Sequence, residues 1–514
     1  MAELLQTLIL IVGVREIIVC TAIILLLGIA RYFASLPDLS GIPWVGKTPG
    51  WFFKGEAKRH FIANGASIID EGYAKYKDFA FRLQTADMDR VVLSPKYVNE
   101  INRKVPEGTL SIQEAMHERL ITRQTKLEKV FGSSLHIDVC KVQLTQNLHA
   151  LIGPLHEEVS YWLAKDIPET GGAVDLNAYH TVLSAIVGSA SRSFVGLPIS
   201  RDSEWLKTAV GYTMDVFGVA VSLRPYPAFL RPVVARFMAG TKRLDDHLNT
   251  AKRCFSPIFA ERLALKDSGT APAEKPVDMI QWMVDSARGA DRDPDFLAHN
   301  ILFMTVAAVH TSAISAVHVL FDLCEMPEYV QPLREEVLRV MKLLDSFMKE
   351  SQRMSPPGLL SFNRKVMKPL TLSGGLSLPA GAFITMPSSG IAHDPEIHQE
   401  PEKFDGFRFY KKRMVSKEDA NRHQFASTGP DSMAFGHGKL ACPGRFFTAA
   451  QDKIVLANIL LRYSVKFPGD QKERLPNVFS GEHVGPNRAQ RVVFEPREDL
   501  DDATRRLLSP STVP

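Results

Sequence analysis

Cysteine is scarce in this sequence, and the spacing of the cysteines excludes two of their common uses. The 514 residues include five cysteines, an odd number, and none of them belongs to a CxxC pair. They lie at Cys20, Cys140, Cys254, Cys324 and Cys442. This pattern argues against a disulfide framework and against a zinc site, and it favours a reducing compartment.

Strong net charge, repeats and nucleotide-binding motifs are also lacking. The 61 lysine and arginine residues nearly balance the 57 aspartate and glutamate residues, which argues against a nucleic-acid partner. We find no internal repeat, no low-complexity tract and no glycine-rich fingerprint for a flavin or a dinucleotide. Apolar residues, by contrast, make up 45% of the chain, which is enough for a sizeable core.

The N-terminus carries two uncharged apolar runs, "LLQTLILIVGV" (4–14) and "IIVCTAIILLLGIA" (17–30), separated by Arg15 and Glu16. Spanning a bilayer takes about 20 residues, so neither run spans one alone. Each charge costs about 2.5–3.5 kcal/mol at the centre of a span, but adjacent opposite charges can pair. Because no small-residue cleavage site is evident, we interpret 17–30, extended back into 8–14, as an uncleaved membrane anchor. The alternative is a buried core helix.

A hinge and a mainly helical body follow. "RYFASLPDLSGIPWVGKTPG" (31–50) places three prolines among glycines and indicates a stiff hinge. Short strands with a turn are expected within 79–95, and further strands with glycine turns within 358–390. Most other segments show helical periodicity, including 327–341. The sequence therefore predicts a mainly α fold with a small β portion.

One expected helix, "ILFMTVAAVHTSAISAVHVLFDL" (301–323), is apolar almost all round and should be buried. Ala307 and Ala308 remove side-chain bulk there, which allows a flat ligand to approach the backbone. The hydroxyl of Thr311 can bond back to the carbonyl of Ala307 or bind a ligand. Taken alone, the stretch fits ordinary core packing around a hydrogen-bonded His310 better than it fits a ligand site.

Two further stretches supply charged residues. In "FMKESQRMSPPG" (347–358), Glu350 and Arg353 stand at i, i+3 on one helix face and can pair, although such pairs are usually solvated. In "PEKFDGFRFY" (401–410), Arg408 lies among aromatic residues. It can stack on them or join Glu350, and the alternative is a surface arginine with a buried stem.

The stretch "AFGHGKLACPGRFF" (434–447) surrounds one thiol, that of Cys442, with Gly436, Gly438, Gly444 and a proline. Neither a disulfide nor a buried core cysteine requires such a neighbourhood.

Taken in order, the motifs AAxHTS, ExxR, PEKFxxFRF and FGxGxxxCxG resemble those of the cytochrome P450 family of haem-thiolate monooxygenases. The resemblance covers the chain from the anchor and hinge to the C-terminal "RVVFEP", and "AAVHTS" is similar to fungal members of terpenoid and mycotoxin pathways. It implies a cytochrome P450 fold that binds haem b. The domains would be 1–36, the anchor and the start of the hinge, and 37–514, the catalytic domain.

The resemblance implies roles for the residues around the cysteine. Cys442 would be the thiolate ligand of the haem iron. Gly436, Gly438 and Gly444 would adopt conformations that side chains forbid, so that backbone N–H groups aim at the sulfur. Phe435 would shield the sulfur.

It also implies roles on the other side of the haem and behind it. Thr311 would organise dioxygen and a proton-relay water, and Arg364 in "SFNRKV" would clamp a haem propionate. His310 stands where the family usually has an acid, and burial should lower its pKa, so that it orients water as a neutral group. The residues of the folding network behind the haem would be Glu350, Arg353 and Arg408.

Some positions depart from the family pattern. Leu440 stands where an arginine or histidine usually reaches a propionate, and the helical Trp-x-x-x-Arg is absent, with only Lys141 as a substitute. The segment 337–349 is short, which either a lost loop or an error in the gene sequence explains. A membrane-bound pseudoenzyme without haem therefore stays open. His310 keeps open a haem-thiolate isomerase or dehydratase that needs no external electrons.

The resemblance further implies partners and location. The substrate would contact the segments 105–135, 195–240, 355–362 and 479–486. The apolar, proline-broken stretch 216–237 is either plain core or a flap in the membrane surface that admits a lipophilic substrate.

Electrons would come from a separate NADPH-dependent reductase in the endoplasmic reticulum membrane, with the catalytic domain cytosolic. Its acidic surface would dock on basic residues on the thiolate side. These residues are Lys411, Lys412, Arg413, Lys439, Arg445 and Lys453.

Overall fold

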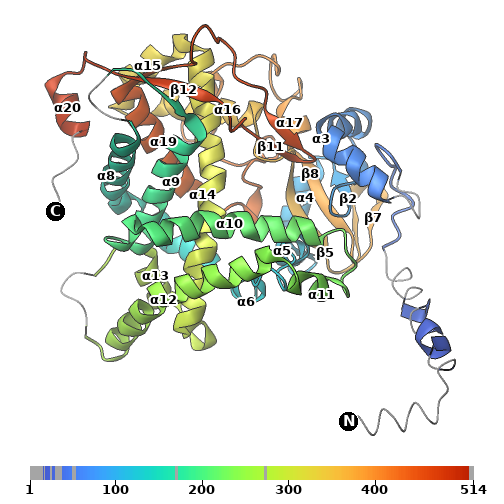
Figure 1. Cartoon of the computed structure of the whole chain (residues 1–514). Helices are drawn as coiled ribbons and strands as arrows, with labels where there is room; N and C mark the ends of the chain where they lie inside the picture. The colour runs from blue at the N-terminus through green and yellow to red at the C-terminus, as the bar shows by residue number, and fades with distance from the viewer. Residues whose placement is uncertain are drawn as a thin grey trace.

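Helices dominate the fold, as the sequence predicts (Figure 1). The computed structural model describes residues 37–48, 54–167, 172–270 and 275–508, together with helical residues 16, 18–23 and 26–28. The α-helices are α3 (Lys54–Tyr76), α4 (Tyr97–Lys104), α5 (Ile112–Leu120), α6 (Glu128–Phe131), α7 (Leu135–Val139), α8 (Leu148–Asp166), α9 (Ala178–Val195), α10 (Ser203–Leu223), α11 (Arg231–Arg236), α12 (Ala239–Asp267), α13 (Met279–Ser286), α14 (Pro294–Glu325), α15 (Val330–Val337), α16 (Lys342–Met354), α17 (Ser388–Ala392), α18 (Arg408–Arg413), α19 (Arg445–Arg462) and α20 (Asp502–Leu508).

The strands form small sheets, of which the sheet containing β2 and β8 lies to one side of the helices (Figure 1). The largest described sheet has the order β1-β2-β8-β5-β3, in which β2 and β8 run parallel and the other neighbours antiparallel. A second sheet has the order β4-β12-β9, and β6-β7 and β10-β11 are separate hairpins. The strands are β1 (Ala80–Gln84), β2 (Asp89–Leu93), β3 (Leu110–Ser111), β4 (Val174–Asn177), β5 (Leu360–Val366), β6 (Leu370–Leu372), β7 (Leu376–Leu378), β8 (Phe383–Pro387), β9 (Tyr463–Lys466), β10 (Val478–Ser480), β11 (His483–Gly485) and β12 (Arg491–Pro496). The strands expected within 79–95 and 358–390 are therefore present.

Helix α14 is the long apolar helix that the sequence predicts, and it runs through the middle of the molecule (Figure 1). It begins after Asp293, whose carboxylate accepts the N–H of Asp295, and Pro294 occupies the first turn, where no N–H is needed. It packs against α9, α10, α12, α16 and α19. Because its apolar residues are covered on nearly every side, its packing sets the positions of the helices around it.

No membrane-spanning helix stands out in the described part of the chain. Only α14 is long and apolar enough, and 72% of its most apolar window is buried inside the protein, as in a core helix. The anchor predicted at 1–36 lies largely outside the described residues. Those described within it belong to a shorter apolar helix, Ile18–Gly28, with exposed side chains such as Leu26. The anchor stays a prediction.

The helix expected over 327–341 is shorter than the periodicity indicates. It consists of a 3₁₀ turn, Pro327–Tyr329, and of α15, which ends at Val337. Met341 has a φ of 49°, a left-handed conformation that a helix cannot continue through. The carboxylate of Glu336 then accepts the N–H groups of Lys342 and Leu343, both at 2.7 Å, and so caps α16. The short 337–349 segment thus has room for a turn and a new helix.

Helix α3 supports the β10-β11 hairpin through a close backbone contact, which yields a test of the packing. A Cβ added to Gly65 would lie 2.2 Å from the carbonyl oxygen of Gly481, whose own N–H donates to Ile62 at 2.9 Å. Since backbone cannot move aside cheaply, we expect Gly65→Ala to lower the free energy of unfolding by about 1–3 kcal/mol. Thermal unfolding followed by circular dichroism measures this.

The matched control lies on the same helix. A Cβ at Gly55 would meet no atom within 4 Å. Gly55→Ala should therefore be neutral or slightly stabilising. Equal melting temperatures for the two variants would show that α3 and the hairpin are not in contact in solution.

Candidate functional site

The loop that precedes α19 is closed around Cys442 by its own backbone. The N–H of Cys442 donates to the carbonyl of Phe435 at 2.8 Å. Gly436 and Gly438 have φ angles of 68° and 77°, in the left-handed region that favours glycine. A Cβ on Gly438 would also lie 2.5 Å from Oδ1 of Asn102. Two of the three glycines are therefore required by the shape of the loop.

The backbone N–H groups of Gly444 and of Arg445, the first residue of α19, act on the thiol of Cys442 and favour its ionised form. Burial raises the pKa of this thiol, whereas the two amides and the charge of Arg445 act in the opposite direction. N–H groups at a helix start favour negative charge, so the thiol faces the groups that stabilise a thiolate.

Gly444 does not behave as expected. Its φ is −86°, which any residue adopts, so the prediction of a conformation forbidden to side chains is wrong at this position. A Cβ there would meet no protein atom within 4 Å. Protein packing therefore does not require glycine at 444.

Phe435 contributes its carbonyl to the loop, and its ring packs edge-on against Phe425, with the ring centroids 5.5 Å apart. This contact ties the loop to the preceding segment. The shielding of the sulfur by the Phe435 ring stays a prediction.

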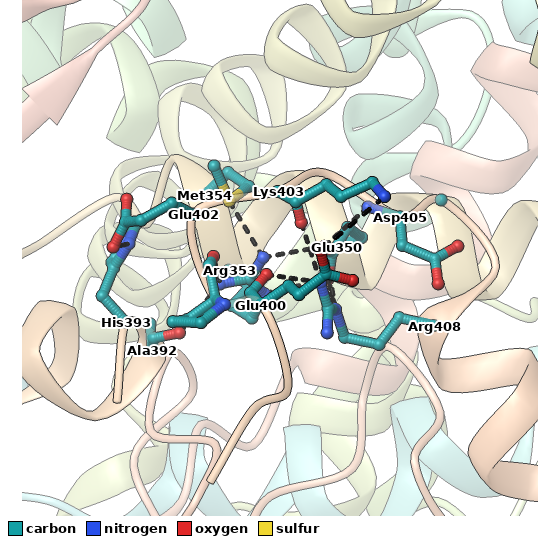
Figure 2. A network of polar contacts seen from close by, with 12 residues as sticks. Glu350, Arg353, Met354, Ala392, His393, Glu400, Glu402, Lys403, Asp405 and Arg408 are labelled. Atoms are coloured by element: carbon teal, nitrogen blue, oxygen red, sulfur yellow. Dashed lines mark hydrogen bonds and ion pairs between the residues drawn. The ribbon is translucent and has the colours of Figure 1, made fainter. Parts of the chain in front are cut away.

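Glu350, Arg353 and Arg408 form one buried network, shown in Figure 2. Glu350 on α16 accepts from Nε and Nη2 of Arg353 at 2.9 and 2.7 Å. It also accepts from Nε of Arg408 at 3.0 Å and from the N–H of Asp405 at 3.0 Å. The side chain of Glu350 is fully buried, so this ion pair differs from a solvated surface pair.

The remaining N–H groups of the two arginines bind backbone carbonyls at the end of α17 and in the irregular segment between α17 and α18. Arg353 donates to Ala392 at 2.8 Å and to Pro401 at 2.7 Å, and Arg408 donates to Lys403 at 2.7 Å. Arginine has five N–H donors in a fixed plane, which allows one side chain to hold several carbonyls. The network thus fastens a segment without regular structure to α16.

Arg364 lies on β5 in a very different environment. Its side chain is buried, and its guanidinium stacks 4.3 Å from the centre of the Phe362 ring. It donates to the carbonyl of Asn363 at 2.8 Å, and no carboxylate of the described residues pairs with it. Burial lowers its pKa to about 10. A buried cation without a counter-ion is costly, so the site fits an anionic group such as a haem propionate.

One strip of α14 is exposed although the helix is mainly buried. Thr311 and Ala307 form this strip, and the hydroxyl of Thr311 donates to the carbonyl of Ala307 at 2.9 Å. Ala308, by contrast, packs against the core. The helix therefore presents one small residue and one hydroxyl to open space.

His310, on the next face of α14, binds Tyr179 rather than Thr311. Its Nδ1 lies 3.0 Å from the hydroxyl of Tyr179 on α9, and its Nε2 is buried without a partner among the described groups. Burial lowers the pKa of His310, as predicted, and the nearby charge of Arg488 adds to this effect. The imidazole is thus neutral at pH 7 and has one nitrogen to spare.

Lys141 and Leu440, two positions that depart from the family pattern, lie in different surroundings. Lys141, in the π-helical turn Cys140–Leu144, donates to the carbonyl of Lys439 at 3.3 Å and so reaches the cysteine loop. Leu440 is 42% exposed.

Together these features fit a haem. The thiol of Cys442 is a candidate iron ligand, Arg364 is a candidate cation for an acidic substituent, and Ala307 and Thr311 of α14 are exposed. The sequence analysis expected backbone N–H groups near the sulfur, but it assigned neither the amide of Arg445 nor the contact of His310 with Tyr179. No local pattern marks Tyr179, because it is 131 residues away from His310.

Removing the charge of Glu350 tests the network. Glu350→Gln leaves two buried arginines without their carboxylate, so we expect a loss of about 3–5 kcal/mol of stability and reduced haem content in the purified protein. Glu402→Gln is the control, because Glu402 lies nearby (Figure 2) with a side chain 78% exposed, and it should change stability by less than about 0.5 kcal/mol. Urea unfolding and the haem-to-protein ratio provide the measurements. Wild-type stability in Glu350→Gln would contradict the role of the network.

Comparison with known proteins agrees with this site. The family model described as Cytochrome P450 matches residues 81–488. A cytochrome P450 monooxygenase of Emericella nidulans is 37% identical over 85% of this chain and 84% of its own length. The cytochrome P450 monooxygenase paxP of Penicillium paxilli is 35% identical, covering 89% of this chain and 90% of its own length.

The fold has a solved counterpart. The crystal structure of the cytochrome P450DA heme domain superposes with a TM-score of 0.64 at 15% identity, covering 89% of this chain and 97% of that one. The likeness confirms the predicted fold. The chain therefore belongs to the cytochrome P450 family and, like its fungal relatives, is a cytochrome P450 monooxygenase.

Proposed function

We propose that this monooxygenase binds haem b through Cys442 and oxidises a lipophilic small molecule, of terpenoid type, in a fungal secondary-metabolite pathway. The observation that carries the proposal is the loop around Cys442, which is bent at Gly436 and Gly438 and closed by the bond from the N–H of Cys442 to the carbonyl of Phe435. The motif "AAVHTS" and the fungal relatives support the pathway.

Each residue of the site has a distinct task in this proposal. Haem, when bound, supplies the activation of dioxygen, and a thiolate ligand favours cleavage of the O–O bond. The amides of Gly444 and Arg445 stabilise the charge on the sulfur, and Arg364 holds a propionate. Thr311 offers a hydroxyl at the open strip of α14. His310, neutral and fixed by Tyr179, orients water through its free nitrogen.

Electrons come from a separate NADPH-dependent reductase in this proposal, because the chain has no nucleotide-binding fingerprint. The ion pairs of the described residues reduce the number of basic residues that are available to dock the reductase. Arg413 and Lys453 both pair with the buried carboxylate of Asp345, so they are structural. Lys412 and Arg445 have no ion-pair partner among the described residues and are the better docking candidates.

The catalytic domain contacts the endoplasmic reticulum membrane in this proposal, beside the anchor at 1–36. Support comes from the segment around α11, where Phe229, Val233 and Phe237 are 72%, 58% and 83% exposed. The interpretation of 216–237 as plain core is therefore wrong for this end of the segment. A patch of exposed apolar side chains next to arginines is typical of a surface that lies in the lipid interface.

Substitution of the cysteine tests the haem-thiolate assignment. Cys442→Ala should abolish the thiolate-type Soret band of the reduced, CO-treated protein and all NADPH-dependent turnover, because the iron loses its sulfur ligand. The control is Cys254→Ala, a partly buried cysteine of α12, which should keep both. Persistence of turnover in Cys442→Ala would refute the assignment.

Two substitutions on α14 separate the proposed roles of Thr311 and His310. Thr311→Ala should lower product per NADPH and raise peroxide, because the hydroxyl on the open strip is lost. His310→Ala should slow NADPH consumption by up to about 100-fold and enlarge the solvent deuterium isotope effect. Tyr179→Phe should give an intermediate rate, since the imidazole is kept but no longer fixed. If His310→Ala matches the parent enzyme in NADPH consumption, in product per NADPH and in the solvent deuterium isotope effect, His310 is a core histidine.

A further inference from the structure

Five charged side chains from separate parts of the chain lie together in the folded structure. We call them the arginine cluster: Asp87, Arg90, Arg119, Arg224 and Glu482. They come from the β1-β2 hairpin, the end of α5, the residue after α10 and the β10-β11 hairpin. Figure 1 shows that the right-hand end of α10 lies beside α5 and α11.

The two carboxylates of the arginine cluster are fully shared by two of its arginines. Arg90 donates to both oxygens of Asp87 at 2.8 and 2.9 Å and to Glu482 at 2.6 Å. Arg119 donates to the other oxygen of Glu482, and its Nε lies 3.9 Å from Asp87. The side chains of Asp87, Arg90 and Glu482 are all less than 10% exposed.

Arg224 is the third arginine, and it has no carboxylate of its own. Its Nη2 and Nε donate to the backbone carbonyl of Arg119 at 2.8 and 3.3 Å, and none of the described residues forms an ion pair with it. Burial lowers the pKa of Arg224, the charge of Arg90 adds to this, and the charges of Asp87 and Glu482 oppose it without forming an ion pair.

Three guanidinium groups against two carboxylates leave one positive charge in excess. Excess charge in a poorly solvated site is unfavourable unless an anion compensates it. The excess lies at Arg224, which is partly exposed, whereas Arg90 is 1% exposed. An anion from outside can therefore reach the arginine that lacks a partner.

Exposed apolar side chains on α10 lead up to Arg224. Val221 and Phe217 lie about one and two turns earlier on the same face of α10 and are 55% and 46% exposed. Phe479, on the hairpin that carries Glu482, is 51% exposed. A cation at the end of an open apolar strip is complementary to a molecule with a long apolar body and one anionic end.

The arginine cluster also connects the segments expected to contact the substrate. Arg119 lies in 105–135, Arg224 in 195–240 and Glu482 in 479–486. The carbonyl of Glu482 accepts the N–H of Leu359, in 355–362, at 2.8 Å. One charged site therefore touches all four segments.

We propose that the substrate of this enzyme carries a carboxylate, which binds Arg224 with support from Arg119, while its apolar body lies along Phe217 and Val221. Arginine binds carboxylates through two parallel N–H bonds, which favours it over a lysine for this task. This inference rests on the proposed function and narrows its substrate class from lipophilic molecules to lipophilic acids.

The test compares an acid with its own ester. Dehydroabietic acid and methyl dehydroabietate, and likewise hexadecanoic acid and its methyl ester, are titrated against the full-length holoenzyme in phosphatidylcholine nanodiscs, and binding is read from the Soret shift. We expect each acid to bind about tenfold or more tightly than its ester, since an ester keeps the shape and loses the charge. Equal affinity of acid and ester would overturn the proposal.

Substitutions test whether Arg224 causes the tighter binding of acids than of their esters. Arg224→Gln should remove the difference between acid and ester, and Arg224→Lys should keep part of it. Arg236→Gln, an exposed arginine of α11, should leave it intact. If Arg224→Gln keeps the full acid preference, the arginine cluster does not bind the acid. If it weakens only binding to phosphatidylserine vesicles, the anion is a lipid headgroup, and the proposal is also wrong.

A failure of the proposed haem-thiolate function can be told apart from a failure of the acid preference. The reduced CO spectrum reports the thiolate-bound haem in every variant and does not depend on the acid. Should that band be missing from the parent protein, calorimetric titration with the same acids and esters still measures the preference and decides the inference.

Discussion

The buried carboxylate of Glu350 is the constraint on which much of this structure depends. Three charges, those of Glu350, Arg353 and Arg408, are removed from water together, and each is stable there only if the other two are in place. Other N–H groups of the arginines bind carbonyls of Pro401 and Lys403, in a segment without helix or strand. The network therefore replaces secondary structure where the chain has none.

A second buried acid on α16, Asp345, connects this helix to the segments on both sides of the cysteine loop. Asp345, about one turn before Glu350, accepts the N–H of Phe425 at 2.9 Å and pairs with Lys453 of α19. Phe425 in turn packs on Phe435 in the cysteine loop. Helix α16 thus holds the segment before the loop and the helix after it. The sulfur of Cys442 is positioned by α16 although no residue of α16 contacts it in these interactions.

Contacts that the sequence predicted join residues close together along the chain, whereas the contacts that it missed join residues far apart along the chain. The long apolar helix, the β1-β2 hairpin and the pairing of Glu350 with Arg353 depend on residues a few positions apart, so a local pattern reveals them. One partner of Arg90, Glu482, lies 392 residues away, and chemistry alone does not select it from 57 acidic residues. The conformation of Gly444 was misjudged because glycine occurs both where it is required and where it is merely allowed.

The arginines of this protein differ mainly in how many acceptors surround them. Arg353 and Arg408 have a carboxylate and several carbonyls each, so their donors are used and they act as structural ties. Arg364 and Arg224 are also largely removed from water, yet each donates only to a backbone carbonyl. Folding alone gains little from a desolvated cation without a counter-ion. Among the described residues, Arg364 and Arg224 are two largely buried arginines that no carboxylate pairs with, and in the proposals above one binds an anionic group of the cofactor and the other an anionic group of the substrate.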